Sequence, residues 1–193
     1  LWAGGIVVSW GVNSAGQLPY PTGLSNSIAI TAGYDSSFAL TTDGTVVGWG
    51  QNLFGQTNVP EGLVRVTAID AGAWHVLALS SNGVVTAWGN NGSGQTNVPA
   101  DLGPVVAISA GQHHSLALLQ NGTIRAWGYN AYGQCNVPTS LTNVVAISAG
   151  AYHSTALRQD GTVVAWGNDG VGQSSVPAAL PAAVARPTPA PPT

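Results

Sequence analysis

Three histidines recur along the chain at intervals of 39 residues, at His75, His114 and His153. Three imidazoles are a sensible ligand set for a zinc ion, so this spacing suggests a metal site. Equivalent residues of a symmetric repeat are held apart, however, unless they all point at the symmetry axis. We therefore expect these histidines to have a structural role and the chain to bind no metal.

The acidic residues do not suggest a catalytic pair. Four of them lie in predicted turns or in connections between repeats: Asp43, Glu61, Asp101 and Asp160. Asp35 lies in a variable loop and has no repeated carboxylate as a partner. The chain also has no phosphate-binding loop, no Gly-x-Ser-x-Gly sequence and no Cys-x-x-Cys pair. We predict that the protein is not an enzyme and that it has no catalytic residues and no cofactor.

Two loops of the repeat change in sequence while the rest of it stays nearly constant. The second position after each Ala-Gly pair reads Asp, Trp, His and Tyr in successive repeats. Trp and Tyr are the residue types expected to dominate the binding energy of protein interfaces. We predict that these loops form a partner-binding surface, against the alternative that exposed loops have drifted without selection. Its residues are Tyr34, Asp35, Phe54, Trp74, His113, Tyr132 and Tyr152.

The elements that position these residues are copies of one repeat. Trp-Gly pairs begin at residues 10, 49, 88, 127 and 166, and Gly-Gln pairs begin at residues 16, 55, 94, 133 and 172. No insertion or deletion interrupts the period of 39 residues. A period of this length is typical of propellers, solenoids and other repeat arrays.

Each repeat has the pattern of a small antiparallel sheet. In one repeat, short, mostly apolar runs at 105–109, 115–119 and 123–127 are each followed within three residues by a glycine. Asn-Gly or Asp-Gly joins the second run to the third and predicts a two-residue hairpin turn with both residues at positive φ. A fourth strand is expected at 134–137, beside a proline that must lie at a strand end. Neighbouring sheets would then pack through Trp127 and its four equivalents.

We predict an all-β fold, a β-propeller with blades of about 39 residues. It has four complete blades and the second half of a fifth, because residues 1–21 align with the second half of a repeat. A closed five-bladed ring is the alternative. The repeats span 1–181, as a half-blade at 1–26 and blades at 27–65, 66–104, 105–143 and 144–181, and a Pro- and Ala-rich tail or linker follows at 182–193.

The half-blade would leave an unpaired strand edge, which is a template for pairing with another chain. We therefore expect an arc that does not close alone as a regular ring. Residues 1–21 would contact a partner or a second copy, or the chain would belong to a longer polypeptide that supplies further blades.

The composition limits the classes of partner. Charged residues make up 6% of the chain, with four Arg, no Lys and a formal net charge of −3. Affinity for nucleic acid comes mainly from clusters of Lys and Arg, so we expect no nucleic-acid partner. No stretch approaches the roughly 18 apolar residues that cross a bilayer, so we expect the chain not to span a membrane. Cys135 is the only cysteine, which rules out an internal disulfide.

The unit Ala-Gly-x-x-His-Ser-x-Ala-Leu, followed by Asn-Gly or Asp-Gly, Ala-Trp-Gly and Gly-Gln-Thr-x-Val-Pro, resembles the regulator-of-chromosome-condensation repeat family. The resemblance covers residues 1 to about 180 and is greatest to the compact bacterial branch, which includes a β-lactamase inhibitor. It implies a protein-binding propeller with a structural histidine and with target-binding aromatic residues in the loop after Ala-Gly. Family members typically have seven blades, whereas four and a half repeats are present here.

We therefore predict a non-enzymatic protein–protein interaction module that works outside the cytoplasm and binds another protein through the variable loops of one propeller face. One alternative is a structural or accessory subunit of a larger extracytoplasmic complex. A second alternative is a carbohydrate-binding lectin, since aromatic residues in blade loops suit stacking on sugar rings.

Overall fold

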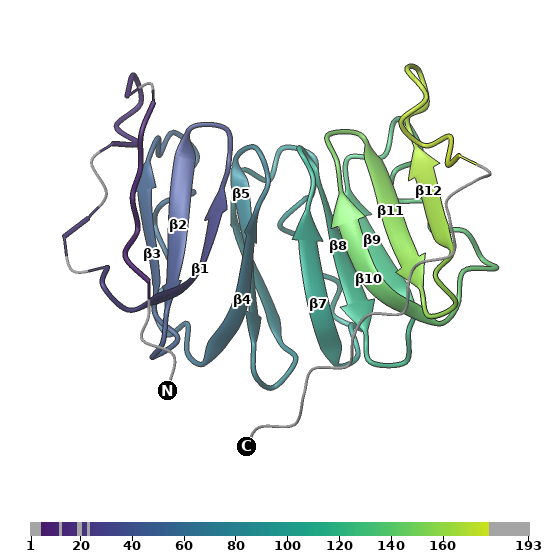
Figure 1. The fold of residues 1–193 in the computed structure, drawn as a ribbon, viewed down its shortest axis with the longest axis horizontal. Helices are drawn as coiled ribbons and strands as arrows, with labels where there is room; N and C mark the ends of the chain where they lie inside the picture. Colours follow the sequence, from purple (N-terminus) through teal and green to yellow (C-terminus); the bar gives the residue numbers. More distant parts are fainter. Residues whose placement is uncertain (1–4, 12, 19–20, 23, 178–193) are drawn as a thin grey trace.

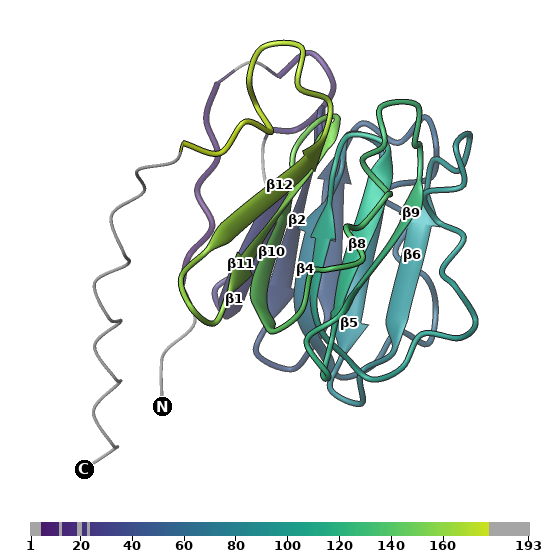
Figure 2. The ribbon, with the colours of Figure 1, turned by 90° about the vertical axis from the view of Figure 1, so that its right-hand side faces the viewer.

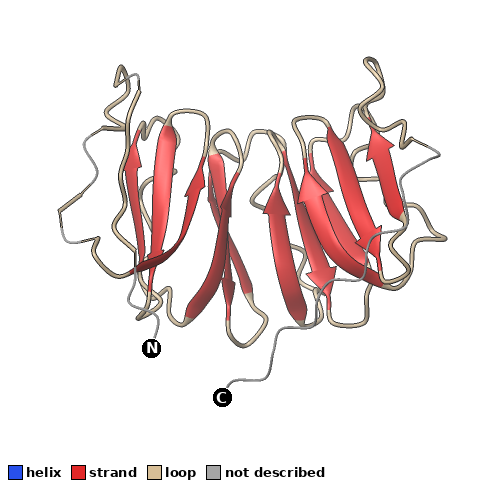
Figure 3. Cartoon of the chain, viewed as in Figure 1, coloured by secondary structure: helices blue, strands red, loops and turns tan. Residues whose placement is uncertain are grey.

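Twelve strands in four antiparallel sheets make up the fold of the part of the chain that the structure describes. The computed structural model describes residues 5–11, 13–18, 21–22 and 24–177, none of which is helical (Figure 3). The predicted all-β class is confirmed. The strands are β1 (Ser27–Ala32), β2 (Ser36–Thr41), β3 (Val46–Gly50), β4 (Val66–Ala71), β5 (His75–Ser80), β6 (Val85–Gly89), β7 (Val105–Ala110), β8 (His114–Leu119), β9 (Ile124–Gly128), β10 (Val144–Ala149), β11 (His153–Arg158) and β12 (Val163–Gly167).

The four sheets follow one another along an arc (Figure 1). The first strand of each sheet contacts the first strand of the next, from β1 through β4 and β7 to β10. Seen from the side, β6 and β9 lie on the side of the arc away from β1 and β10 (Figure 2). These are consecutive propeller blades. The described residues contain no helix long and apolar enough to cross a membrane. The blade boundaries stay predictions, and residues 178–193, which include the predicted tail, lie outside the described part.

The turn between the second and third strands differs from the predicted two-residue turn. In the first blade, Gly44 N donates to Thr41 O at 3.0 Å and Thr41 N donates to Thr45 O at 2.9 Å, which closes a three-residue loop. Only Gly44 has a positive φ there, at 82°. The Asp43 carboxylate accepts the Thr45 N–H at 3.1 Å, and this local bond favours negative φ at Asp43. The prediction of two residues at positive φ is therefore wrong.

No fourth strand forms at 134–137 or at its described equivalents. Gly133 N donates to Asn130 O at 3.0 Å, and Asn136 N donates to Gly133 O at 2.9 Å, so this loop consists of consecutive turns. The Asn130 side chain also accepts the Cys135 N–H at 2.8 Å. These local bonds occupy backbone groups that a fourth strand would use in its ladder. The expectation of a four-stranded blade is wrong, and each described sheet has three strands.

Apolar layers between neighbouring sheets form the core. Trp127 is 8% exposed and packs with Leu77 and Leu79 of the preceding sheet. Its indole Nε1 donates to the Gln95 carbonyl at 2.9 Å, which links the Trp-Gly pair of one repeat to the Gly-Gln pair of the repeat before it. The same bond is made by Trp49, Trp88 and Trp166. The predicted packing role is confirmed for these four tryptophans.

Trp10 does not share this environment, because no described sheet precedes it. Its side chain is 84% exposed, so the packing role predicted for it is wrong in the described structure. The strand predicted around it is reduced to one bridge, in which Gly5 N donates to Ser27 O at 2.9 Å. Val7 packs with Trp49 of the first sheet.

The position of the same N-terminal segment shows whether the described blades close into a ring. It lies beside the first sheet, at the opposite end of the arc from β12 (Figure 1). The described residues thus form an open arc, and the alternative of a closed five-bladed ring is not what they adopt. A contact of residues 1–21 with a partner, a second copy or further blades stays a prediction.

Candidate functional site

Two sets of loops lie on one face of the propeller, which is the upper side in Figure 1. One set joins the first strand of each sheet to the second, as at residues 72–74 between β4 and β5. The other set follows the third strand, as at residues 51–56 after β3. The hairpin turns between second and third strands lie on the opposite face. The variable loops of all four blades therefore converge on a single face of the molecule.

Four rings from the first three blades form a continuous cluster on this face, with Trp74 at its centre. The ring centroids of Tyr34 and Phe54 each lie 5.8 Å from that of Trp74. The ring of His113 lies 5.3 Å from Trp74. Pairs of aromatic rings at such separations gain interaction free energy beyond that from burying their area. The ring contacts therefore stabilise the arrangement of the cluster.

Three tyrosines continue the cluster into the last blade. The Tyr129 ring lies 6.3 Å from His113 and 6.2 Å from both Tyr132 and Tyr152, which are themselves 5.3 Å apart. Tyr34, Phe54 and Tyr132 are between 46% and 71% exposed, so the cluster is open to a partner. We call this set the aromatic ridge: Tyr34, Phe54, Trp74, His113, Tyr129, Tyr132 and Tyr152.

Six of the seven residues predicted from the sequence belong to the ridge. The seventh, Asp35, follows Tyr34 and accepts the Gln51 N–H on its backbone carbonyl at 2.8 Å, while its carboxylate has no hydrogen bond within the described residues. Tyr129 was missed. Its position, directly after Trp-Gly, reads Gln51, Asn90, Tyr129 and Asn168 in successive repeats, and this variation is a signal that could have found it. That these residues bind a partner stays a prediction.

Backbone contacts between the first three blades hold their loops of the first set in place. Tyr34 N donates to Ala73 O at 3.0 Å, and Ala73 N donates to Gln112 O at 3.3 Å. The preceding glycines are needed for this approach, because a Cβ atom on Gly33 would lie 2.7 Å from the Gly72 carbonyl oxygen. Loops that are already fixed to one another lose less conformational entropy when a partner binds.

The repeated histidines serve the interfaces between blades. His75 Nε2 lies 3.0 Å from Ser115 Oγ, and His114 Nε2 lies 3.0 Å from Ser154 Oγ. Ser115 Oγ donates its proton to Gln95 O at 2.9 Å, so it accepts from the histidine, which carries its proton on Nε2. Burial lowers the pKa of both histidines to about 4. The described residues hold no group of three or more His, Cys, Asp or Glu arranged to bind a metal.

Four segments of the chain match the model of one protein family, the regulator of chromosome condensation (RCC1) repeat, at residues 28–56, 66–95, 105–134 and 144–173. The chain belongs to this family. Each matched RCC1 repeat ends at the glutamine of a Gly-Gln pair. In three of the four, the carbonyl of that glutamine accepts the indole bond of the next blade. The resemblance to the compact bacterial branch of the RCC1 family stays a prediction.

Solved structures share the propeller fold at low sequence identity. Prp20p from Saccharomyces cerevisiae is 23% identical with a TM-score of 0.65, over 74% of this chain and 45% of that one. The ectodomain of the Physcomitrella patens receptor kinase CR4 is 24% identical with a TM-score of 0.69, over 82% and 46%. Human WBSCR16 is 21% identical with a TM-score of 0.69, over 81% and 56%.

These similarities show the fold alone, and this chain spans about half the length of each protein. A comparison with curated protein sequences found no match.

Proposed function

We propose that this chain is a non-enzymatic module that binds another protein through the aromatic ridge. The observation that carries the proposal is the unbroken series of ring contacts, from Tyr34 in the first blade to Tyr152 in the last. A surface of exposed aromatic rings on loops fixed by backbone hydrogen bonds has the composition and the rigidity of an interface centre.

Proteins with the same fold support the proposal. Prp20p has binding properties to Gsp1p and histones, and it has also been solved with Kap60 bound to it. RCC1-type propellers thus serve as protein-binding scaffolds. Their known partners do not identify the partner here, because a fold hosts many functions and the site decides among them.

Replacing Trp74 by alanine is expected to weaken partner binding by about 2 kcal/mol or more, which is roughly a thirtyfold increase in Kd. Trp74 touches three other rings of the ridge, so its removal also loosens their packing. The partner would be captured from the source organism on immobilised protein, and the affinity of both variants measured by calorimetry.

Val84→Ala is the matched control, since Val84 is 54% exposed and adjoins a hairpin turn on the face opposite the ridge. It is expected to leave the affinity unchanged. Equal affinities for the wild type and the Trp74→Ala variant would remove the ridge as the binding surface.

Two other functions make different predictions for the same sample. A permanent structural subunit would co-purify with fixed partners in constant ratio, whereas a reversible binder is isolated as a free, monodisperse protein. A lectin would bind a glycan array through its aromatic rings, with loss of that signal in the Trp74→Ala variant.

We also propose that the protein works outside the cytoplasm. The proposal is supported by the occurrence of the same fold in the ectodomain of a receptor kinase. Fractionation of the source cells with an antibody to the chain tests this, and recovery in the cytoplasmic fraction would reject it.

A further inference from the structure

An open hollow of about 420 Å³ lies beside the aromatic ridge, where the first strands of the four sheets end. Its wall consists of the Ala-Gly positions of all four repeats and the residues that follow them. Apart from Tyr34 and Gln112, every lining residue is alanine or glycine, so the polar part of the wall is mostly backbone.

Most backbone donors around this hollow are already used, whereas the N–H groups of Gln112 and Ala151 donate no bond within the described residues. The N–H groups of the four glycines donate to backbone carbonyls of the second strands, as Gly72 N does to His75 O at 2.9 Å. The N–H groups of Ala71 and Ala110 donate to the Asp70 carboxylate at 3.1 and 2.8 Å.

The acceptors are left over. Within the described residues, the carbonyl oxygens of Gly72, Gly111 and Gly150 accept no N–H or O–H hydrogen bond. These free carbonyl oxygens can accept hydrogen bonds from a ligand that donates them.

A negative charge adjoins the hollow. Asp70 precedes Ala71 of the wall, and its carboxylate also accepts bonds from Thr31 Oγ1 at 3.1 Å and Ser109 Oγ at 3.2 Å. These bonds fix the carboxylate of Asp70, which belongs to β4, between β1 and β7 and next to the lining residue Ala71. No positive side chain takes part in this network.

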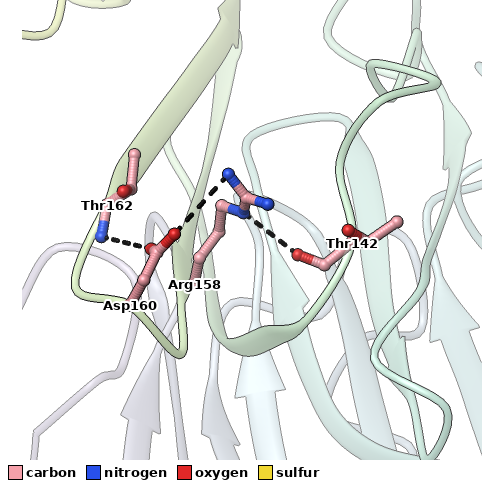
Figure 4. A network of polar contacts seen from close by, with 4 residues as sticks. All are labelled: Thr142, Arg158, Asp160 and Thr162. Carbon is pink, nitrogen blue, oxygen red and sulfur yellow. Dashed lines mark hydrogen bonds and ion pairs between the residues drawn. The ribbon is translucent and has the colours of Figure 1, made fainter.

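The described arginines all lie near the hairpin side of the blades, away from the loops that carry the ridge. Arg158 donates from Nε to Thr142 O at 3.1 Å and lies 3.7 Å from the Asp160 carboxylate, beside a hairpin turn (Figure 4). Arg125 pairs with Asp101. Arg65 lines a separate hollow that also contains hairpin residues.

Among the described residues, the face that carries the ridge holds acidic side chains and no arginine. Asp35 and Asp169 lie in its loops, and hydrogen bonds from Ser175 and Ser174 hold the pKa of Asp169 below its ordinary value. Burial lowers the pKa of His113, which keeps its ring neutral at pH 7. The formal charges of the described side chains near the ridge are therefore negative, and this favours a basic partner.

We propose that the hollow receives a lysine or arginine side chain of the protein that the ridge binds. The alkyl stem would pack on the alanine methyl groups, and the charged head would donate to the free glycine carbonyls in the field of Asp70. The adjacent ring of Tyr34 adds a cation–π contact. This inference rests on the proposed function, since it specifies the chemistry of the same binding surface.

The test uses peptides as probes. A random peptide library is selected on the immobilised protein, and peptides that also bind the Trp74→Ala variant are discarded. The remaining peptides are expected to be enriched in Lys or Arg. Replacement of that residue by norleucine, which keeps the alkyl stem and removes the charge, is expected to weaken binding at least tenfold.

A charge placed in the hollow gives the complementary measurement. Gln112→Lys is expected to weaken the same peptides at least tenfold by repulsion and occupation of the hollow. Val64→Lys makes the same change of net charge at an exposed position that lines the hollow of Arg65, and it is expected to have no effect.

Peptides that need Trp74 but tolerate norleucine would overturn this inference and leave the proposed function standing. A selection that yields no Trp74-dependent peptide would overturn both.

Discussion

Replacing Trp127 with alanine is expected to destabilise the protein by about 3–5 kcal/mol, the usual cost of removing a large buried aromatic side chain. Trp127 is 8% exposed and fills the layer between the second and third sheets, against Leu77 and Leu79. Its indole N–H also binds the Gln95 carbonyl, which would lose one of its two donors. Urea unfolding followed by circular dichroism measures the loss.

Trp10→Ala is the control that separates position from residue type. Trp10 occupies the same place in the repeat but is 84% exposed, so its removal is expected to change the stability by no more than about 0.5 kcal/mol. Similar losses for both variants would mean that the layer between sheets is not what stabilises the arc. Trp127→Phe keeps most of the ring and loses the indole bond, and an intermediate loss is expected for it.

The sequence predicts the architecture well because every blade faces the same packing problem. Each inner layer needs a large ring, and the ring needs an acceptor at a fixed place in the preceding blade. Trp127 and Gln95 meet this need in the same way as the pairs before and after them. A requirement repeated at constant spacing is visible in a single sequence, since the chain carries its own alignment.

The errors arose where short-range hydrogen bonds compete with the sheet. Asp43 favours a three-residue turn by binding the Thr45 N–H, although the same Asp-Gly pair also suits a two-residue turn. Asn130 binds the Cys135 N–H and holds the long loop in turns where a fourth strand was expected. Both side chains can serve either conformation, so their identity alone does not decide the outcome.

The candidate site was predicted only as far as its side chains are distinctive. Trp74 and Tyr152 stand out because they interrupt a constant pattern, and Tyr129 could have been found in the same way. The hollow beside them could not, because it is built from alanine and glycine and from backbone carbonyls. Its charge comes from Asp70, whose role depends on Thr31 and Ser109 of other blades.

The protein is expected to lose stability as the pH falls from about 6.5 to about 4. In the unfolded chain His75 and His114 take up protons near their ordinary pKa of about 6.5. In the folded protein burial lowers the pKa of each to about 4. Each Nδ1 atom is buried and has no hydrogen-bond acceptor nearby for the N–H group that protonation would create. The unfolded state therefore binds more protons within this window, and acid favours it.

The expected size and limits of the effect follow from linkage. Each histidine contributes at most about 1.4 kcal/mol per pH unit, so the pair contributes several kcal/mol across the window and nothing above it. The exposed carboxylates with lowered pKa values, such as Asp101 and Asp160, act mainly at lower pH, as it falls past their unfolded pKa of about 3.9. Urea unfolding at a series of pH values from 8 to 4 would give the slope.

The first interface between complete blades supplies a natural variant for this test. Ser36 stands there in place of the histidine, and Val76 stands in place of the serine that would receive its bond. Copying this pair into the other two interfaces, as His75→Ser with Ser115→Val and His114→Ser with Ser154→Val, removes both buried imidazoles. The absolute stability falls because cavities remain, but the slope between pH 6.5 and 4 is expected to flatten. A slope as steep as that of the wild type would show that other groups, and not these two histidines, make the fold sensitive to acid.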